Sequence, residues 1–151
     1  MATLLFMRHA HLTLKVGAGA DVEYQGQVST AAVEVTAGDT VTYPVLDGTV
    51  PTQVGPESYA LHLVAAQDWT SATGLARFLW DHAGEEATFF LQAHGQGVTP
   101  TDDLPAVEGP VRLVAPTYGG AVNTYAELDV TLPCSLRPTM NTTALPVAAA
   151  E

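Results

Sequence analysis

Histidines are the side chains of this sequence whose spacing first suggests chemistry. His9 and His11 stand two positions apart, so in an extended segment both side chains would lie on one side and could share a metal ion. A metal site needs further ligands, and no HExxH motif, carboxylate triad or third close histidine accompanies this pair. We therefore interpret the two histidines as surface side chains and predict no metal site.

The acidic pairs and the serines also lack a catalytic context. The carboxylates at 102–103 and 85–86 are neighbours on predicted turns, whereas general acid–base catalysis needs carboxylates that converge on a cleft. No serine stands in a Gly-x-Ser-x-Gly elbow, and segment 17–20 lacks the lysine and helix of a phosphate-binding loop. His62 and His94 are interpreted as structural histidines. The sequence predicts a protein that is not an enzyme and binds no cofactor.

The composition describes one domain with few charges. A chain of 151 residues can bury a substantial core, and 47% of its residues are hydrophobic while only 14% are charged. So low a charged fraction favours extensive self-association over a monomer, because large apolar patches on soluble proteins are usually covered. We expect a single domain over 1–151, with an N-terminal arm at 1–10 and a loose C-terminal tail at 140–151.

The charge balance argues against tight nucleic-acid binding. The chain has 16 acidic and 5 basic residues, for a net charge of −11 at pH 7. Nucleic-acid binding depends on lysines and arginines that contact phosphates, and five scattered basic residues cannot supply it. Two interpretations stay open: acidity for solubility, or an acidic surface that does not hold a polyanion sliding past it.

The sequence predicts synthesis in the cytoplasm without membrane insertion. No apolar run approaches the roughly 20 residues of a membrane span, and the first residues lack the charge-first pattern of a signal peptide. The single cysteine, Cys134, excludes an intramolecular disulfide, and we interpret it as a small apolar filler.

Strands dominate the expected secondary structure. The segments 32–36 and 40–45 flank Gly38-Asp39 and are predicted to form a β-hairpin over 32–45, and 46–56 is expected to be a long irregular loop. Both faces of segment 58–66 are fairly apolar, which suits a central strand covered on each side. Further strands are expected at 11–16, at 87–93 and in the C-terminal part of the chain, with loops at 17–26 and 95–105.

One helix of about 12 residues is expected between an N-cap at Thr70 or Ser71 and Gly84. Its apolar stripe of Leu75, Phe78, Leu79 and His82 must cover a sheet, with Trp69 leading in as a core residue. Trp80 falls off the stripe and is interpreted as a subunit contact, since aromatic residues are enriched there.

Seven or eight strands and one helix, without βαβ alternation, predict a mainly β protein. The expected architecture is an antiparallel β-sandwich or partly closed barrel with one flanking α-helix.

The stretch 108–139 carries the clearest pattern. A short strand leads through a loop with Gly119-Gly120 into a strand that stops at Leu132-Pro133, and Arg137-Pro138-Thr139 follow. The alternation from Tyr125 predicts an apolar face of Ala126, Leu128, Val130 and Leu132 and a polar face of Tyr125, Glu127, Asp129 and Thr131. This stretch resembles the C-terminal part of tail tube proteins (major tail proteins) of long-tailed bacteriophages.

The resemblance implies a structural virion protein that works by self-assembly. Family members form hexameric rings whose sheets join edge to edge into a continuous β-barrel around a lumen. The rings stack into a tail tube, a conduit for genome delivery into the host. The implied location is the virion tail, after synthesis in the host cytoplasm. The implied partners are copies of the chain, other tail proteins at the tube ends, and genomic DNA that passes without tight binding.

The resemblance also suggests roles for particular residues. We expect the hairpin 32–45 and strand 125–132 to contribute to the barrel, and the loop 46–58 to stack one ring on the next. Candidates for acids that face the lumen and repel phosphates are Glu34, Glu127 and Asp129. Candidates for contacts between rings or subunits are Asp47, Gly48, Val50, Val54 and Trp80.

Two alternatives stay open at this point. The chain could be another ring-forming tail component, such as a terminator or connector, which does not polymerise. It could also be a monomeric β-sandwich module that binds a sugar or a protein.

Overall fold

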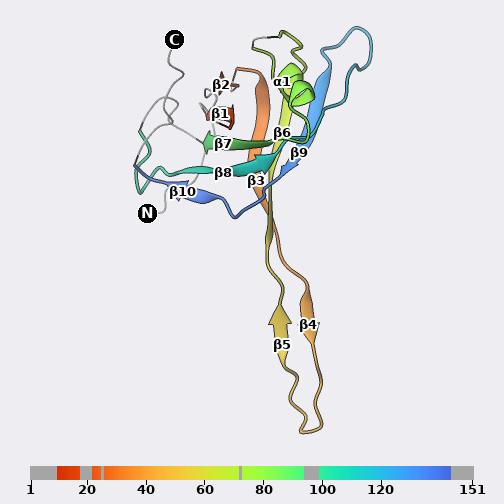
Figure 1. The fold of residues 1–151 in the computed structure, drawn as a ribbon, viewed down its shortest axis with the longest axis vertical. Coiled ribbons are helices and arrows are strands. Elements are labelled where there is room, and N and C mark those ends of the chain that lie inside the picture. The colour runs from red at the N-terminus through yellow and green to blue at the C-terminus, as the bar shows by residue number, and fades with distance from the viewer. Residues whose placement is uncertain (1–9, 18–21, 25, 72, 94–98, 144–151) are drawn as a thin grey trace.

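Strand-forming alternation extends over most of the chain. The computed structural model describes residues 10–17, 22–24, 26–71, 73–93 and 99–143 (Figure 1). Within them lie ten strands and one helix. Their bounds are β1 His11–Val16, β2 Val22–Glu23, β3 Val28–Thr36, β4 Thr40–Thr42, β5 Thr52–Val54, β6 Ser58–Ala66, α1 Leu75–Asp81, β7 Glu86–Gln92, β8 Ala106–Arg112, β9 Glu127–Pro133 and β10 Thr139–Asn141.

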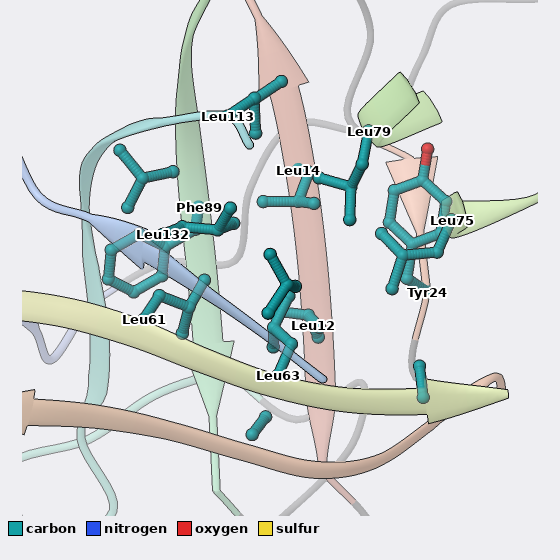
Figure 2. Close-up of a cluster of buried hydrophobic side chains, with 14 of the residues drawn as sticks. Leu12, Leu14, Tyr24, Leu61, Leu63, Leu75, Leu79, Phe89, Leu113 and Leu132 are labelled. Carbon is teal, nitrogen blue, oxygen red and sulfur yellow. The ribbon is translucent and has the colours of Figure 1, made fainter. Parts of the chain in front are cut away.

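The strands form two sheets that pack on each other and a separate two-stranded ribbon. The larger sheet has the order β10-β8-β7-β1-β2, the smaller one β3-β6-β9, and the ribbon is β4-β5. Every pairing is antiparallel. The strands of the two sheets cross at a steep angle (Figures 1 and 2), as in orthogonally packed sheets. The predicted fold class, mainly β and antiparallel with one helix, is confirmed; no closed barrel forms within the described residues.

The core lies where the inner faces of the two sheets meet. Alternation gives each sheet one apolar face, so leucines from both sheets interdigitate with Phe89, and α1 adds Leu75 and Leu79 (Figure 2). Each such side chain contributes about 1.5–3 kcal/mol by leaving water. The largest members, all below 2% exposed, are Phe89, Leu12, Leu14, Leu61, Leu63, Leu75, Leu79, Leu113, Leu128 and Leu132.

Helix α1 is shorter than the sequence predicted because it begins at a tertiary cap. The N-cap is Gly74, without a side-chain cap of its own, and the Leu75 amide donates to Oε1 of Gln27 at 2.9 Å. Asp68 instead accepts a hydrogen bond from the Thr70 amide, which holds the preceding residues in a turn. The predicted start at Thr70 or Ser71 is therefore wrong. Of the predicted apolar stripe, Leu75 and Leu79 are buried, and Phe78 and His82 are half-buried.

Tyr24 makes the stability of the fold sensitive to high pH. Its side chain is 2% exposed and packs on Phe78, and burial raises the pKa of Tyr24 to about 12, from the usual 10.0. The unfolded chain ionises first as pH rises, so this contribution is complete below pH 10 and is lost between about pH 10 and 12. We expect the free energy of unfolding to fall by about 1 kcal/mol per pH unit there. Urea unfolding of wild type and of Tyr24→Phe checks this, because the variant should lack that part of the slope; equal slopes would contradict it.

The predicted hairpin over 32–45 is wrong. β3 pairs with β6, and the chain continues from β3 into β4, which pairs with β5. Hydrogen bonds continue this pairing beyond the two strands to a three-residue tip, 46–48. The Val45 amide donates to the Thr49 carbonyl at 3.1 Å, and Gly48 takes φ 89°, the left-handed position that such loops require. The result is a slender ribbon that projects from the domain (Figure 1). We call residues 39–55 the arm; most of the predicted irregular loop 46–56 is its tip and return strand.

Gly38 marks the base of the arm rather than a turn. A Cβ at Gly38 would lie 2.1 Å from the Gly55 carbonyl oxygen and 2.6 Å from that of Pro56. Beside this point the Gly55 amide donates to the Asp39 carbonyl at 2.7 Å. The glycine is needed because two backbones approach closely here, which the sequence pattern does not distinguish from a turn glycine.

Other differences concern the ends of the larger sheet. The predicted loop 17–26 contains β2, and residues 140–141 of the predicted tail belong to β10, which pairs with β8. His11 is not a surface residue: it is buried, with Nε2 3.3 Å from Oε1 of Glu23.

Cys134 packs on the core, and burial raises the pKa of its thiol. Residues 1–9, with His9, and the tail residues 144–151 lie outside the described residues, as does His94.

Candidate functional site

The smaller sheet has one face in the core and one face that no described layer covers. Along β9, Leu128, Val130 and Leu132 are buried, while Glu127 and Asp129 are exposed, as the alternation predicts. In β6, the expectation that both faces are covered is wrong, because His62 and Val64 are only half-buried. We call the uncovered side the open face; it carries Glu34, His62, Glu127, Asp129 and Thr131.

The register of three strands brings the predicted acids onto this face. Ala60 pairs with Glu34 of β3, Val64 with Asp129 and Ala66 with Glu127 of β9, so all three carboxylates are on the same side of the sheet. The sequence pattern placed each acid on the polar side of its own strand. The pairing of β3 and β9 with β6 brings the three acids onto one face of the sheet.

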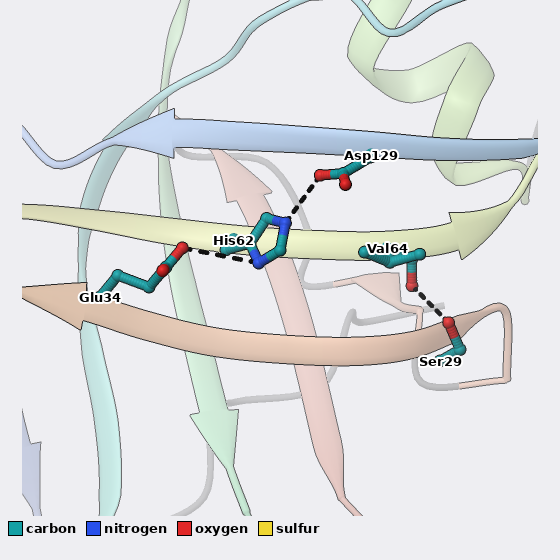
Figure 3. Close-up of polar contacts among 5 residues, drawn as sticks. All are labelled: Ser29, Glu34, His62, Val64 and Asp129. Atoms are coloured by element: carbon teal, nitrogen blue, oxygen red, sulfur yellow. Dashed lines mark hydrogen bonds and ion pairs between the residues drawn. The ribbon is translucent and has the colours of Figure 1, made fainter.

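His62 lies between two of these carboxylates. Its Nε2 is 2.7 Å from Oδ1 of Asp129, and its Nδ1 is 3.5 Å from Oε1 of Glu34 (Figure 3). Both ring nitrogens therefore have acidic partners, which agrees with a structural role for this histidine. The ion pairs of the arginines, Arg77 with Asp81 and Arg112 with Glu86, lie elsewhere. The open face is thus predominantly acidic.

The two outer strands of the smaller sheet are edges. Within the described part of the chain, β3 and β9 each pair on one side only, with β6. An edge strand presents a row of backbone N–H and C=O groups that can pair with another chain. This sheet could therefore be extended at both ends by copies of itself.

Four of the five predicted contact residues lie on the arm. Val50 and Val54 are 54% and 60% exposed, and Asp47 and Gly48 form the tip. The Asp47 side chain accepts hydrogen bonds from the Thr49 amide and hydroxyl at 2.9 and 2.6 Å, which lower the pKa of Asp47. Sequence reasoning missed Leu46, the most exposed large hydrophobic side chain in the part of the chain that the structure describes. Its place before Asp-Gly, a strong hairpin signal, could have identified it.

The fifth, Trp80, lies in a separate place, on helix α1. It lines a pocket of about 430 Å³ together with Trp69, Arg77, Asp81 and Tyr118. We call this the aromatic pocket. Trp69 meets Trp80 and Tyr118 edge to face, with ring centroids 5.9 and 5.0 Å apart. The two charged residues that line the pocket form an ion pair, with Arg77 Nε 3.0 Å from Asp81 Oδ2.

Gln67 fixes the walls of the aromatic pocket. Its Oε1 accepts from Trp69 Nε1 at 3.1 Å and from the Gly119 amide at 3.0 Å, and its Nε2 donates to the Gly119 carbonyl. The residue before Gly119 is Tyr118, so the loop between β8 and β9 holds its ring against Trp69. No sequence pattern indicates Gln67 or Tyr118, because the contact between their segments joins residues about 50 positions apart.

The ionisable side chains of the described residues form no cluster that would hold a metal ion. Nowhere in them do three or more histidine, cysteine or carboxylate side chains gather as a metal site would require. The acidic pairs at 102–103 and 85–86 are exposed. No helix among them has the length and apolar character to cross a membrane.

Several solved structures share this fold. The chain is similar to the tail of an empty GTA particle refined helically with C6 symmetry, with a TM-score of 0.56 and 16% identity over 86% of this chain and 95% of that one. It is also similar to the sheath/tube terminator of an extracellular contractile injection system, PVC, in the extended state (TM-score 0.53, 17% identity, 93% and 99% covered). A third is the tube-terminating cap of the anti-feeding prophage (TM-score 0.54, 16% identity, 95% of each chain covered).

The likeness extends across nearly the whole of these chains, at identities that show the fold alone. No protein-family model matches the chain, and no curated protein matches it in sequence. The fold is therefore that of proteins from tail tubes, tube terminators and tube caps.

Proposed function

We propose that this protein is a non-enzymatic subunit that assembles with its own copies into hexameric rings of a phage-like tail, and that the rings stack into a tube. The observation that carries the proposal is the smaller sheet, with a free edge strand at each end and an acidic open face. The fold shared with tail components supports it, as does the C6 symmetry of one of those assemblies.

Ring closure follows from the two edges. In the proposed ring, β3 of one copy pairs with β9 of the next, so the three-stranded sheets join into one barrel and the exposed edges disappear. Such a contact uses two different surfaces and closes when its rotation completes a circle. The core already occupies one side of each sheet, which leaves the open face to line the lumen.

An acidic lumen suits a conduit for genomic DNA. In the proposed tube Glu34, Glu127 and Asp129 repel phosphates, so DNA passes without being held. The arm extends beyond the domain and takes the role proposed for loop 46–58, contact with the neighbouring ring. Other tail proteins would bind the tube ends, and the protein would reside in the tail of the particle.

A tube terminator is the second candidate, since two of the similar structures are a terminator and a cap. A terminator would form rings that do not polymerise. A monomeric binding module would form neither rings nor filaments.

Negative-stain microscopy of the purified protein, with a sizing column, separates these functions. We expect long hollow filaments of even diameter at high protein concentration. Discrete rings without filaments would assign the terminator role, and a monomer at every concentration would contradict the assembly proposal.

A further inference from the structure

Two of the exposed apolar surfaces among the described residues have no role in the proposed ring closure. One is the arm tip, where the side chain of Leu46 is fully exposed and Val50 is 54% exposed. The other is the aromatic pocket, where Trp80 and Tyr118 are 54% and 75% exposed. Exposed apolar surface of this kind on an assembling protein marks a contact site.

The two surfaces lie at opposite ends of the molecule. In Figure 1 the arm projects from one end of the long axis, while α1, whose residues line the aromatic pocket, sits at the other. Copies that repeat along this axis would therefore bring the arm tip of one toward the pocket of the next. A contact between two different surfaces that does not close on itself produces an open stack.

The chemistry of the two surfaces is complementary. The arm tip offers Leu46 beside the carboxylate of Asp47, which is fully exposed. The pocket offers aromatic walls for an aliphatic side chain and the guanidinium of Arg77, whose Nε pairs with Asp81 at 3.0 Å. Arg77 is one of only five lysines and arginines in the chain. Apolar anchors that fill aromatic pockets are the usual centres of protein contacts, and charge pairs fix their orientation.

We infer that the aromatic pocket is the receptor for the arm tip of a second copy in the adjacent ring, with Leu46 seated against Trp69, Trp80 and Tyr118 and Asp47 facing Arg77. This inference rests on the proposed function and names the partner surface of its stacking contact. It assigns Trp80 to the contact between rings and Gln67 to holding the pocket open for it.

The two tryptophans of the chain both line the pocket, so their fluorescence reports its occupancy. One protein carries Leu46→Asp, which disables the arm and keeps the pocket. A second carries Trp69→Phe with Trp80→Ala, which disables the pocket, keeps the arm and removes all tryptophan. Leu46 is fully exposed and makes no part of the core, so its replacement leaves the domain folded. Trp80→Ala alone serves as a second pocket variant should the double change lower the melting temperature.

Titrating the tryptophan-free protein into the arm-deficient protein is expected to shift the emission to shorter wavelength, with saturation near one arm per pocket. The matched control is the same tryptophan-free protein carrying Leu46→Asp, which should give no shift. By microscopy each variant alone should form single rings, and the mixture should form paired rings that do not grow. Leu136→Asp, at a leucine 70% exposed elsewhere, should form filaments like wild type.

Two results would overturn the inference: no spectral shift between variants that both form rings, or filaments of wild-type length from the Trp80→Ala protein. The failure of the proposed function has a different signature. In that case wild type and variants all stay monomeric on the sizing column, while the titration still tests contact between arm and pocket.

Discussion

Replacing Gly38 by alanine is expected to abolish filament formation while the domain stays folded. The added Cβ would meet the carbonyl oxygens of Gly55 and Pro56 at 2.1 and 2.6 Å. Those are backbone atoms, which cannot rotate away as a side chain can, so the two strands must separate at the base of the arm. The hydrogen bond from the Gly55 amide to the Asp39 carbonyl lies beside this point and would be lost.

The effect on filament formation is expected to be large because a small rotation at the base of the arm moves its distant tip. About nine residues separate Gly38 from the tip, which at about 3.3 Å each gives a length near 30 Å. A deflection of about 10° at the base moves the tip by about 5 Å, more than a contact between side chains tolerates. The core lies in the other sheets, so we expect the melting temperature to change by only a few degrees.

Microscopy, sizing and thermal melting measure this result together. The matched control is Gly26→Ala, because nothing lies within 4 Å of a Cβ at Gly26. That variant should form filaments like wild type. Wild-type filaments from the Gly38→Ala protein would show that the arm does not stack rings in the way proposed.

Reversing the charge of the open face is expected to slow DNA ejection from assembled particles by about tenfold or more at low salt. The changes Glu34→Lys, Glu127→Lys and Asp129→Lys convert three negative charges per subunit into three positive ones. Lysines that line the lumen would bind the phosphates of DNA. This binding weakens steeply as the salt concentration rises. The release rate should therefore recover as the salt concentration rises.

Two controls separate a lumen effect from other causes. The changes Glu86→Lys, Asp102→Lys and Asp103→Lys add the same charge at exposed positions away from the open face, and should leave ejection unchanged. The neutral set Glu34→Gln, Glu127→Gln and Asp129→Asn removes the partners of His62 without adding positive charge, so it reports any effect of losing those contacts. Ejection at the wild-type rate from particles built with the reversed face would exclude a lumen role for these acids.

The features that could be predicted from the sequence are those set by residues close to one another in the chain. The alternation of β9 and the apolar stripe of α1 are set by neighbours in the sequence. The buried side of β9 was predicted correctly, and in α1 the stripe residues Leu75 and Leu79 are buried. The lumen candidates Glu34, Glu127 and Asp129 were placed on polar sides by the same reasoning. Their lumen role stays a prediction.

The errors share a physical origin in contacts between distant segments. Gly38 is needed because the backbone of Gly55 approaches it closely. Without knowledge of that contact, a glycine at this position is explained equally well by a turn. The start of α1 is set by Gln27, which is 48 residues from Leu75, and so the local caps at Thr70 and Ser71 were misleading. The walls of the aromatic pocket depend on Gln67 and Gly119 in the same way.

The slenderness of the arm has a mechanical consequence. Two strands without a covering layer make a compliant element, whereas the sheets behind them are stiffened by a shared core. In the proposed tube each ring would behave as a rigid disc and each set of arms as a joint. Curvature would then accumulate at the joints, so the tail could bend along its length while the bore within every ring kept a constant diameter.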